Sequence, residues 1–64
     1  MSRKIKQLIK DLEKAGFINR GGKGSHRNFI HPKGIAITVS GKFGDDAKPY
    51  QEKEVDIKIK RSKK

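Results

Sequence analysis

A chain of 64 residues without a single cysteine has to fold around one small hydrophobic core. At this length folding buries only about 60% of the surface of the unfolded chain. Neither a disulfide nor a thiolate-bound metal can stabilise it. We therefore expect one domain over residues 1–64, with residues 60–64 as a frayed basic tail. Because so small a core leaves no room for a buried substrate cavity, any chemistry has to occur on the surface or in a shallow groove.

The excess of positive charge indicates a polyanionic partner. Seventeen Lys and Arg stand against seven Asp and Glu, a formal net charge of +10. Residues 1–44 carry ten basic and two acidic side chains, a net of +8, whereas residues 45–64 carry seven and five, a net of +2. This imbalance is atypical of an enzyme of small neutral metabolites and typical of a nucleic-acid-binding protein. The sequence has no apolar run of the length of a membrane span or a signal peptide, so we expect a cytoplasmic protein without a membrane partner.

The first predicted element is a helix over about residues 3–15. Apolar residues recur at the i, i+3, i+4 and i+7 spacing of one helical face, at Ile5, Leu8, Ile9 and Leu12. Ser2 is a candidate N-cap. Gly16 suits the left-handed position after a helix, and Phe17 can pack back on Leu12 in a Schellman motif. A second stripe of this helix is basic and consists of Arg3, Lys6, Lys10 and Lys14. It is either a solvated face or one that faces phosphates or acidic groups.

Three short segments then predict an antiparallel meander. The β-prone residues 17–20 are followed by a glycine-rich hairpin loop, residues 21–24. Residues 25–31 form the second predicted strand, which Pro32-Lys33-Gly34 ends in a tight turn. Residues 35–40 alternate large apolar with small or polar side chains, as a half-buried strand does. Residues 41–44 then loop away from the sheet.

The C-terminal segment allows two interpretations. Asp45-Asp46 could cap a helix with Pro49 in its first turn and an apolar stripe of Tyr50, Val55 and Ile59. Residues 55–60, however, alternate as a strand does. We favour a helix from about residue 48, because the sheet needs a second covering element. The predicted fold is α+β, with the order α-β-β-β-α of a double-stranded-RNA-binding domain and both helices on one face of a three-stranded antiparallel sheet.

Several short motifs resemble the HicA toxins of bacterial type II toxin–antitoxin pairs. They are LEKAGF at residues 12–17, GSHRNF at residues 24–29 with His31-Pro32, ITV at residues 37–39, and DDAKPY at residues 45–50. The resemblance runs over nearly the whole chain, and its most specific part is Gly-Ser-His followed by an aromatic residue three positions after the His. It implies an endoribonuclease, an mRNA interferase, that cleaves mRNA without a metal and so inhibits translation and growth. It also implies neutralisation by a HicB-type antitoxin.

His26 is the candidate catalytic residue on chemical grounds as well. RNA is cleaved when its 2′-hydroxyl attacks the adjacent phosphodiester, and imidazole is the side chain that titrates nearest to neutrality and suits this proton transfer. The charge that develops on the phosphorus centre needs nearby cations or N–H donors. The candidates for RNA binding are Lys6, Lys10, Lys23, Ser25, Arg27 and Lys42, and Arg3 is a further cation of the same surface.

A second histidine does not complete an acid–base pair. His26 and His31 are five residues apart, so on a regular strand they point to opposite faces. Phe29 is the best core anchor of this strand, which places His26 on the open face and gives His31 a structural or rim position. A stacking platform is not evident, because at least two of the four aromatic residues are expected in the core: Phe17, Phe29, Phe43 and Tyr50.

Two other chemistries are disfavoured. Residues 21–24 lack the Gly-Lys-Ser/Thr ending of a nucleotide-binding loop, so they form either an RNA-contacting hairpin or a plain β-turn. No histidine is close in sequence to the acidic residues of the C-terminal third, which are Asp45, Asp46, Glu52 and Glu54. We therefore predict neither a metal nor a cofactor. The alternative to a ribonuclease is a non-catalytic basic RNA-binding module of the same fold.

Overall fold

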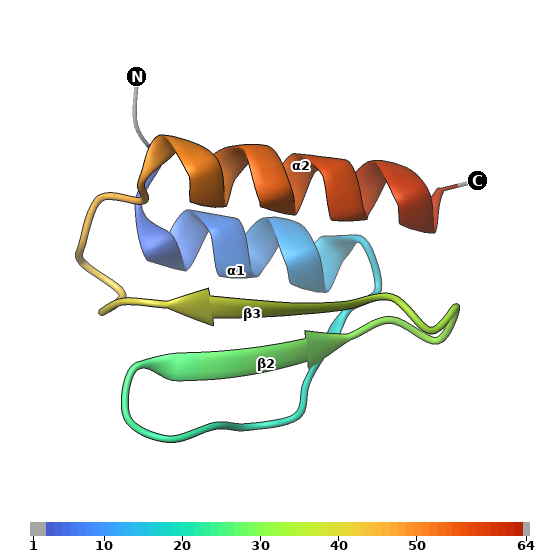
Figure 1. The fold of residues 1–64 in the computed structure, drawn as a ribbon, viewed down its shortest axis with the longest axis horizontal. Helices are drawn as coiled ribbons and strands as arrows, with labels where there is room; N and C mark the ends of the chain where they lie inside the picture. The colour runs from blue at the N-terminus through green and yellow to red at the C-terminus, as the bar shows by residue number, and fades with distance from the viewer. Residues whose placement is uncertain (1–2, 64) are drawn as a thin grey trace.

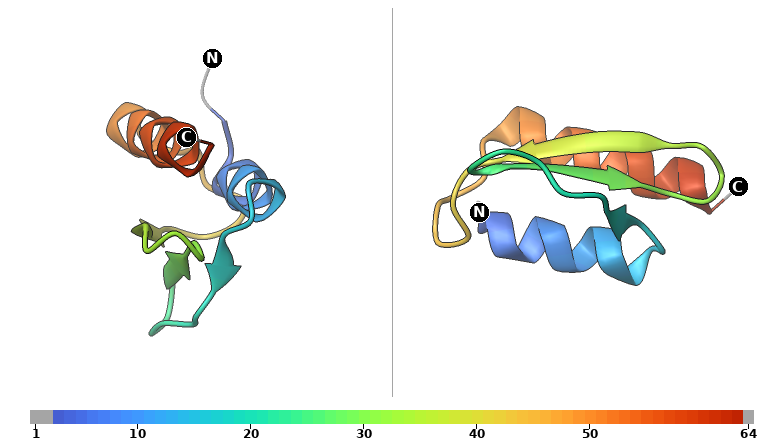
Figure 2. Two further views of the ribbon diagram at one scale, coloured as in Figure 1. Left: turned by 90° about the vertical axis from the view of Figure 1, so that its right-hand side faces the viewer. Right: turned by 90° about the horizontal axis from the view of Figure 1, so that it is seen from below.

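A computed structural model describes residues 3–63 of the chain. Its elements are α1 (Ile5–Lys14), β1 (Ile18–Asn19), β2 (His26–Ile30), β3 (Ala36–Ser40) and α2 (Pro49–Ser62). The strands form an antiparallel sheet in the order β1-β2-β3. Both helices lie side by side on one face of this sheet and leave the other face open (Figures 1 and 2). The predicted α-β-β-β-α order and its resemblance to a double-stranded-RNA-binding domain are thus confirmed.

The start of α1 is capped by a distant loop. The helix begins at Ile5, later than the predicted residue 3, and its N-cap residue Lys4 makes no side-chain cap hydrogen bond. The Ile5 N–H donates to the carbonyl of Asp45 at 2.9 Å, and the Lys6 N–H donates to the carbonyl of Phe43 at 3.2 Å. These carbonyls satisfy N–H groups that a helix start leaves without a partner. The predicted N-cap, Ser2, lies outside the described residues.

The end of α1 is the predicted Schellman motif. Gly16 has a φ of +98°. Its N–H donates to the carbonyl of Glu13 at 3.0 Å, and the Phe17 N–H donates to the carbonyl of Leu12 at 3.0 Å. Both bonds satisfy carbonyls of the last helical turn, and buried Phe17 packs back under the helix.

The core lies between the helices and the covered face of the sheet. Phe29 of β2 is fully buried and pairs with Ile37 of β3, while Arg27 pairs with Val39. Among residues 3–63, the buried apolar residues of the core are Ile5, Leu8, Ile9, Leu12, Phe17, Phe29, Ile37, Val39, Ala47 and Val55. Since the apolar stripe of α1 is entirely within this set, the periodicity of the sequence predicted the covered face of that helix correctly.

The C-terminal segment is a helix, as favoured, but with a different apolar stripe. Val55 is buried and Ile59 is packed against the core, whereas Ile57 is 46% exposed and Tyr50 is 60% exposed. The predicted core position of Tyr50 is therefore wrong. Residues four apart share a face of a helix, so Gln51 lies on the same face of α2 as buried Val55, and Tyr50, one residue earlier, does not. Within residues 3–63, no helix combines the length and the apolar character that crossing a membrane requires.

The start of α2 also differs from the prediction. Asp45-Asp46 does not cap this helix. Its N-cap is Lys48, whose backbone N–H donates to Oε1 of Gln51 at 2.8 Å. Asp45 closes the preceding turn instead, by accepting a hydrogen bond from the Lys42 N–H at 3.3 Å, and Asp46 forms an ion pair with Lys4 at 2.7 Å.

One cation of the basic stripe joins the two helices. The guanidinium of Arg3 lies 3.0 Å from carboxylate oxygens of Asp11 on α1 and of Glu52 and Asp56 on α2. The side-chain hydrogen bond from Arg3 lowers the pKa of Glu52 below its ordinary value, although partial desolvation opposes this shift. The basic stripe was expected to be either a solvated face or a face toward phosphates or acidic groups, and Arg3 faces acidic groups. These contacts commit its guanidinium to holding the helices together rather than to binding RNA.

Candidate active site and nucleic-acid interface

His26 stands at the start of β2 on the open face of the sheet. Its imidazole is exposed, and the residue pairs with Ser40 of β3. Its N–H donates to the carbonyl of Lys23 at 3.0 Å, which closes a turn at the end of the glycine-rich loop. Because buried Phe29 points toward the helices, His26, Asn28 and Ile30 share the opposite face. The parity prediction for His26 and Phe29 is confirmed.

Gly22 allows the loop to pass close behind His26. A Cβ built at residue 22 would overlap the carbonyl oxygen of His26 and would lie 2.9 Å from its carbonyl carbon. The loop is held in this position by the hydrogen bond from the Asn28 N–H to the carbonyl of Gly21 at 2.9 Å. The glycine-rich sequence therefore sets how near the loop approaches the candidate catalytic residue.

Arg27 ties the loop after β3 to the start of β2. Its Nη1 donates to the carbonyl of Gly41 at 2.8 Å and to the carbonyl of Ser25 at 3.1 Å. Its guanidinium carbon lies 4.3 Å from the centre of the Phe43 ring. The Gly41 N–H in turn donates to the carbonyl of Ser25 at 3.2 Å. This clamp fixes where residues 41–43 lie relative to His26.

The predicted RNA-binding residues divide between two sides of β2. Lys23 precedes His26 by one turn, and Lys42 follows the residue after Ser40, the cross-strand partner of His26. Lys6 and Lys10 of α1 line a groove on the other side, together with Arg27. Both sides belong to the end of the sheet at which β2 begins, so the structure brings most of the predicted cations to one region without placing them all beside the imidazole.

Ser25 is the predicted residue whose position fits its role least well. It is half-buried and lines a separate hollow of about 260 Å³ together with Asp45 and Asp46. Two carboxylates against one cation, Lys48, give the lining of this hollow a net charge of −1, which disfavours a phosphate there. The backbone carbonyl of Ser25, which accepts hydrogen bonds from Arg27 and Gly41, shapes the site more directly than its hydroxyl.

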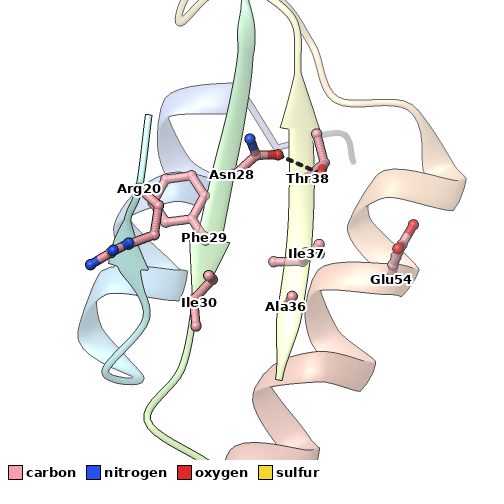
Figure 3. A pocket seen from close by; sticks show the side chains of 8 residues that line it. All are labelled: Arg20, Asn28, Phe29, Ile30, Ala36, Ile37, Thr38 and Glu54. Carbon is pink, nitrogen blue, oxygen red and sulfur yellow. Dashed lines mark hydrogen bonds between the residues drawn. The ribbon is translucent and has the colours of Figure 1, made fainter. Parts of the chain in front are cut away.

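The open face next to His26 carries residues that sequence reasoning missed. A shallow depression of about 550 Å³ is lined by Arg20, Asn28 and Thr38, and the Thr38 hydroxyl donates to Oδ1 of Asn28 at 2.8 Å (Figure 3). Arg20 adds a cation to this face. The strand parity of His26 already pointed to Asn28, but Arg20 and Thr38 required the register of the sheet, in which the Arg20 N–H donates to the carbonyl of Asn28 at 2.7 Å.

His31 is remote from this region and structural, as predicted. Its Nε2–H donates to the carbonyl of Ala15 at 3.1 Å, since a carbonyl can only accept, and the Lys33 N–H donates to Nδ1 at 3.1 Å. The ring also meets Phe17 edge-on, with 5.0 Å between ring centres. Among residues 3–63, no group of three or more His, Asp or Glu side chains is arranged to hold a metal ion.

Comparison with known proteins identifies the family. Curated proteins gave no match to the chain. The sequence model of the family described as the HicA toxin of bacterial toxin–antitoxin pairs matches residues 5–63, a span that contains both helices and all three strands. This match extends over far more than half of the 64 residues. The chain therefore belongs to the HicA toxin family of bacterial toxin–antitoxin systems.

Proposed function

We propose that this protein is a metal-independent endoribonuclease that cleaves mRNA in the cytoplasm with His26 as its single catalytic residue. The observation that carries the proposal is the position of His26. Its imidazole is exposed on the open face of the sheet, directly after the basic glycine-rich loop and across from the strand that leads to Lys42. Membership in the HicA family supports the role of a toxin. Cleavage of mRNA would inhibit translation and growth.

The proposed reaction needs one proton acceptor and several cations. His26 takes the proton of the RNA 2′-hydroxyl, the 2′-oxygen bonds to phosphorus, and the bond from phosphorus to the 5′-oxygen breaks. The imidazolium then returns the proton to the leaving 5′-oxygen. Lys23 and Lys42 lie on the two loops that flank His26, and their ammonium groups would stabilise the negative charge that develops on the phosphate oxygens.

The partner that restrains the toxin is proposed to be a HicB-type antitoxin. A surface with a net charge of +10 favours association with an acidic protein that competes with RNA. We expect this antitoxin to cover His26 and residues 21–24, so that the imidazole is closed to a nucleotide in the complex.

Comparison of the wild type with His26→Ala tests the proposal. Labelled RNA is incubated with each protein in the presence of a chelator, and cleavage is followed under single-turnover conditions. Loss of a general base or acid typically lowers the rate by ~10²–10⁴. Because His26 is exposed and lies on the face of β2 opposite to Phe29, its removal should change stability by only about 0.5 kcal/mol. Cleavage by His26→Ala at the wild-type rate would overturn the catalytic assignment and favour a non-catalytic RNA-binding module.

A further inference from the structure

Phe43 is an aromatic residue that the hydrophobic core does not use. Its side chain is 53% exposed, whereas Phe17 and Phe29 are buried. It lies at a surface groove of about 320 Å³ between α1 and the β1–β2 hairpin, which Ile9 and Asn19 also line. Arg27 also lines this groove. Consecutive strand residues point to opposite faces, so the groove and the imidazole of His26 lie on opposite sides of β2.

The Phe43 ring is held in position by a fixed cation. The Arg27 guanidinium carbon lies 4.3 Å from the ring centre, and its Nη1 donates to two backbone carbonyls, of Gly41 and of Ser25. A cation over an aromatic face attracts it electrostatically. The backbone carbonyl of Phe43 also accepts a hydrogen bond from the Lys6 N–H of α1 at 3.2 Å. Arg27 covers one face of the ring, so an exposed ring that is fixed in this way offers its other face as a flat apolar surface at little cost in conformational entropy.

The groove is positively charged next to this ring. Lys6 and Lys10 line it from successive turns of α1, about 6 Å apart along the helix axis. Within residues 3–63 neither ammonium group is engaged in an ion pair. Glu13 is the one acidic side chain of the lining, so three cations and one anion leave the groove a net charge of +2. A ligand with an aromatic face and a negative charge is complementary to these features.

We propose that this groove binds one unpaired nucleotide of the RNA substrate, with its base stacked on Phe43 and its phosphate between Lys6 and Lys10. The inference rests on the proposed ribonuclease function. Because Arg27 directly follows His26, a strand of RNA that passes the start of β2 would reach both the imidazole and the groove. A nucleotide fits better than a protein segment, since every base presents a π-face and every nucleotide carries a phosphate. The groove would thus position the RNA next to the scissile bond.

Binding of a short single-stranded RNA to variants in the uncleaving His26→Ala background tests the stacking. Phe43→Leu should weaken binding by about 5- to 150-fold, which matches the ~1–3 kcal/mol typical of one base stacked on an aromatic side chain. Tyr50→Leu is the matched control, because Tyr50 is 60% exposed but lies on α2 away from the groove, and it should bind as the parent does. Glu13→Gln should change affinity in the opposite direction, since it removes the only negative charge of the lining.

A second measurement reports contact with the base directly. The chain contains no tryptophan, so Phe43→Trp introduces a single indole at the groove and Tyr50→Trp introduces one elsewhere. RNA should quench the fluorescence of Phe43→Trp and leave that of Tyr50→Trp unchanged. An oligomer of abasic ribose phosphates with the same charge should bind more weakly and quench neither variant.

The outcomes separate the two proposals. If the wild type cleaves RNA while Phe43→Leu binds as tightly as its parent and Phe43→Trp is not quenched, the nucleotide groove is refuted and the ribonuclease assignment stands. If Phe43→Trp is quenched by RNA but the wild type does not cleave, the groove stands and the catalytic proposal fails. Quenching by an acidic peptide and not by RNA would also refute the nucleotide groove and identify its occupant as a protein.

Discussion

Replacement of Gly22 by alanine should impair cleavage without touching the imidazole. A Cβ at this position would overlap the carbonyl oxygen of His26. To restore a carbon–oxygen separation of about 3.3 Å, the loop and the start of β2 must move apart by on the order of 1 Å. A displacement of this size at a reacting group can lower the rate by ~10²-fold. The same overpacking should destabilise the fold by about 1–3 kcal/mol. For a domain of this size each kcal/mol lowers the midpoint of thermal unfolding by roughly 4–8 °C.

The assay is single-turnover RNA cleavage below the unfolding transition of the variant, together with thermal unfolding followed by circular dichroism. Gly44→Ala is the matched control: no atom lies within 4 Å of a Cβ built there, and Gly44 is not among the glycines with positive φ. It should cleave at the wild-type rate and change stability by no more than about 0.5 kcal/mol. If folded Gly22→Ala cleaves as fast as Gly44→Ala, the approach of the loop does not position His26, and the argument is refuted.

Two further perturbations test the framework of the fold. His31→Ala should lower the free energy of unfolding by about 2–3 kcal/mol in urea titrations, because it loses two hydrogen bonds and the edge contact with Phe17, yet it should keep its RNA cleavage rate; a loss of cleavage as large as that of His26→Ala would show that His31 belongs to the site. The hydrogen bond from Arg3 lowers the pKa of Glu52 in the folded state, so its stabilising contribution is complete above the unfolded pKa of about 4.3 and is lost as the pH falls through the lower folded value. Glu52→Gln should therefore show a weaker dependence of thermal stability on pH below about 4, and an unchanged dependence would mean that this ion pair does not couple protonation to folding.

The elements with strong local patterns could be predicted from the sequence. The stripe of Ile5, Leu8, Ile9 and Leu12 and the Gly16-Phe17 pair fix both the covered face and the end of α1. The start of α1 could not be predicted, because the partners of its first N–H groups are carbonyls of Phe43 and Asp45, some 40 residues away in the chain. Long-range capping of this kind leaves no local signal.

The second helix shows where a pattern was ambiguous. Residues 55–60 alternate as a strand does, and the structure resolves the conflict by burying Val55 and packing Ile59 on the core while it leaves Ile57 exposed. Tertiary packing thus decided a segment whose apolar residues fit two periods. The helical stripe of Tyr50, Val55 and Ile59 predicts a core position for Tyr50, but Tyr50 faces solvent. The side chain of neighbouring Gln51 turns toward the sheet instead, where its Nε2 donates to the carbonyl of Ser40 at 2.9 Å.

Strand parity predicted that His26 lies on the open face of the sheet, but it did not predict the groove at Phe43. One buried residue, Phe29, is enough to assign His26 to the uncovered face. The groove depends on Phe43 reaching Arg27 from a loop 16 residues further along the chain, and no periodic pattern encodes that contact. The sequence therefore predicted the face of the sheet on which His26 lies, but it did not predict the groove that is proposed to position the RNA.

The adjacency of His26 and Arg27 has a consequence for how this small chain can act on RNA. The ten buried apolar residues of the described part of the chain form a core too small to enclose a substrate, so the RNA has to be positioned by contacts on the surface. Consecutive residues of a strand provide this, because the first presents its imidazole to the open side and the second anchors Phe43 on the side of α1. A strand of RNA that bends around the start of β2 would be held by the groove while its phosphate meets His26. Insertion of one residue between His26 and Arg27 would shift one of the two side chains to the opposite face, and it should therefore abolish cleavage even where RNA binding and folding persist.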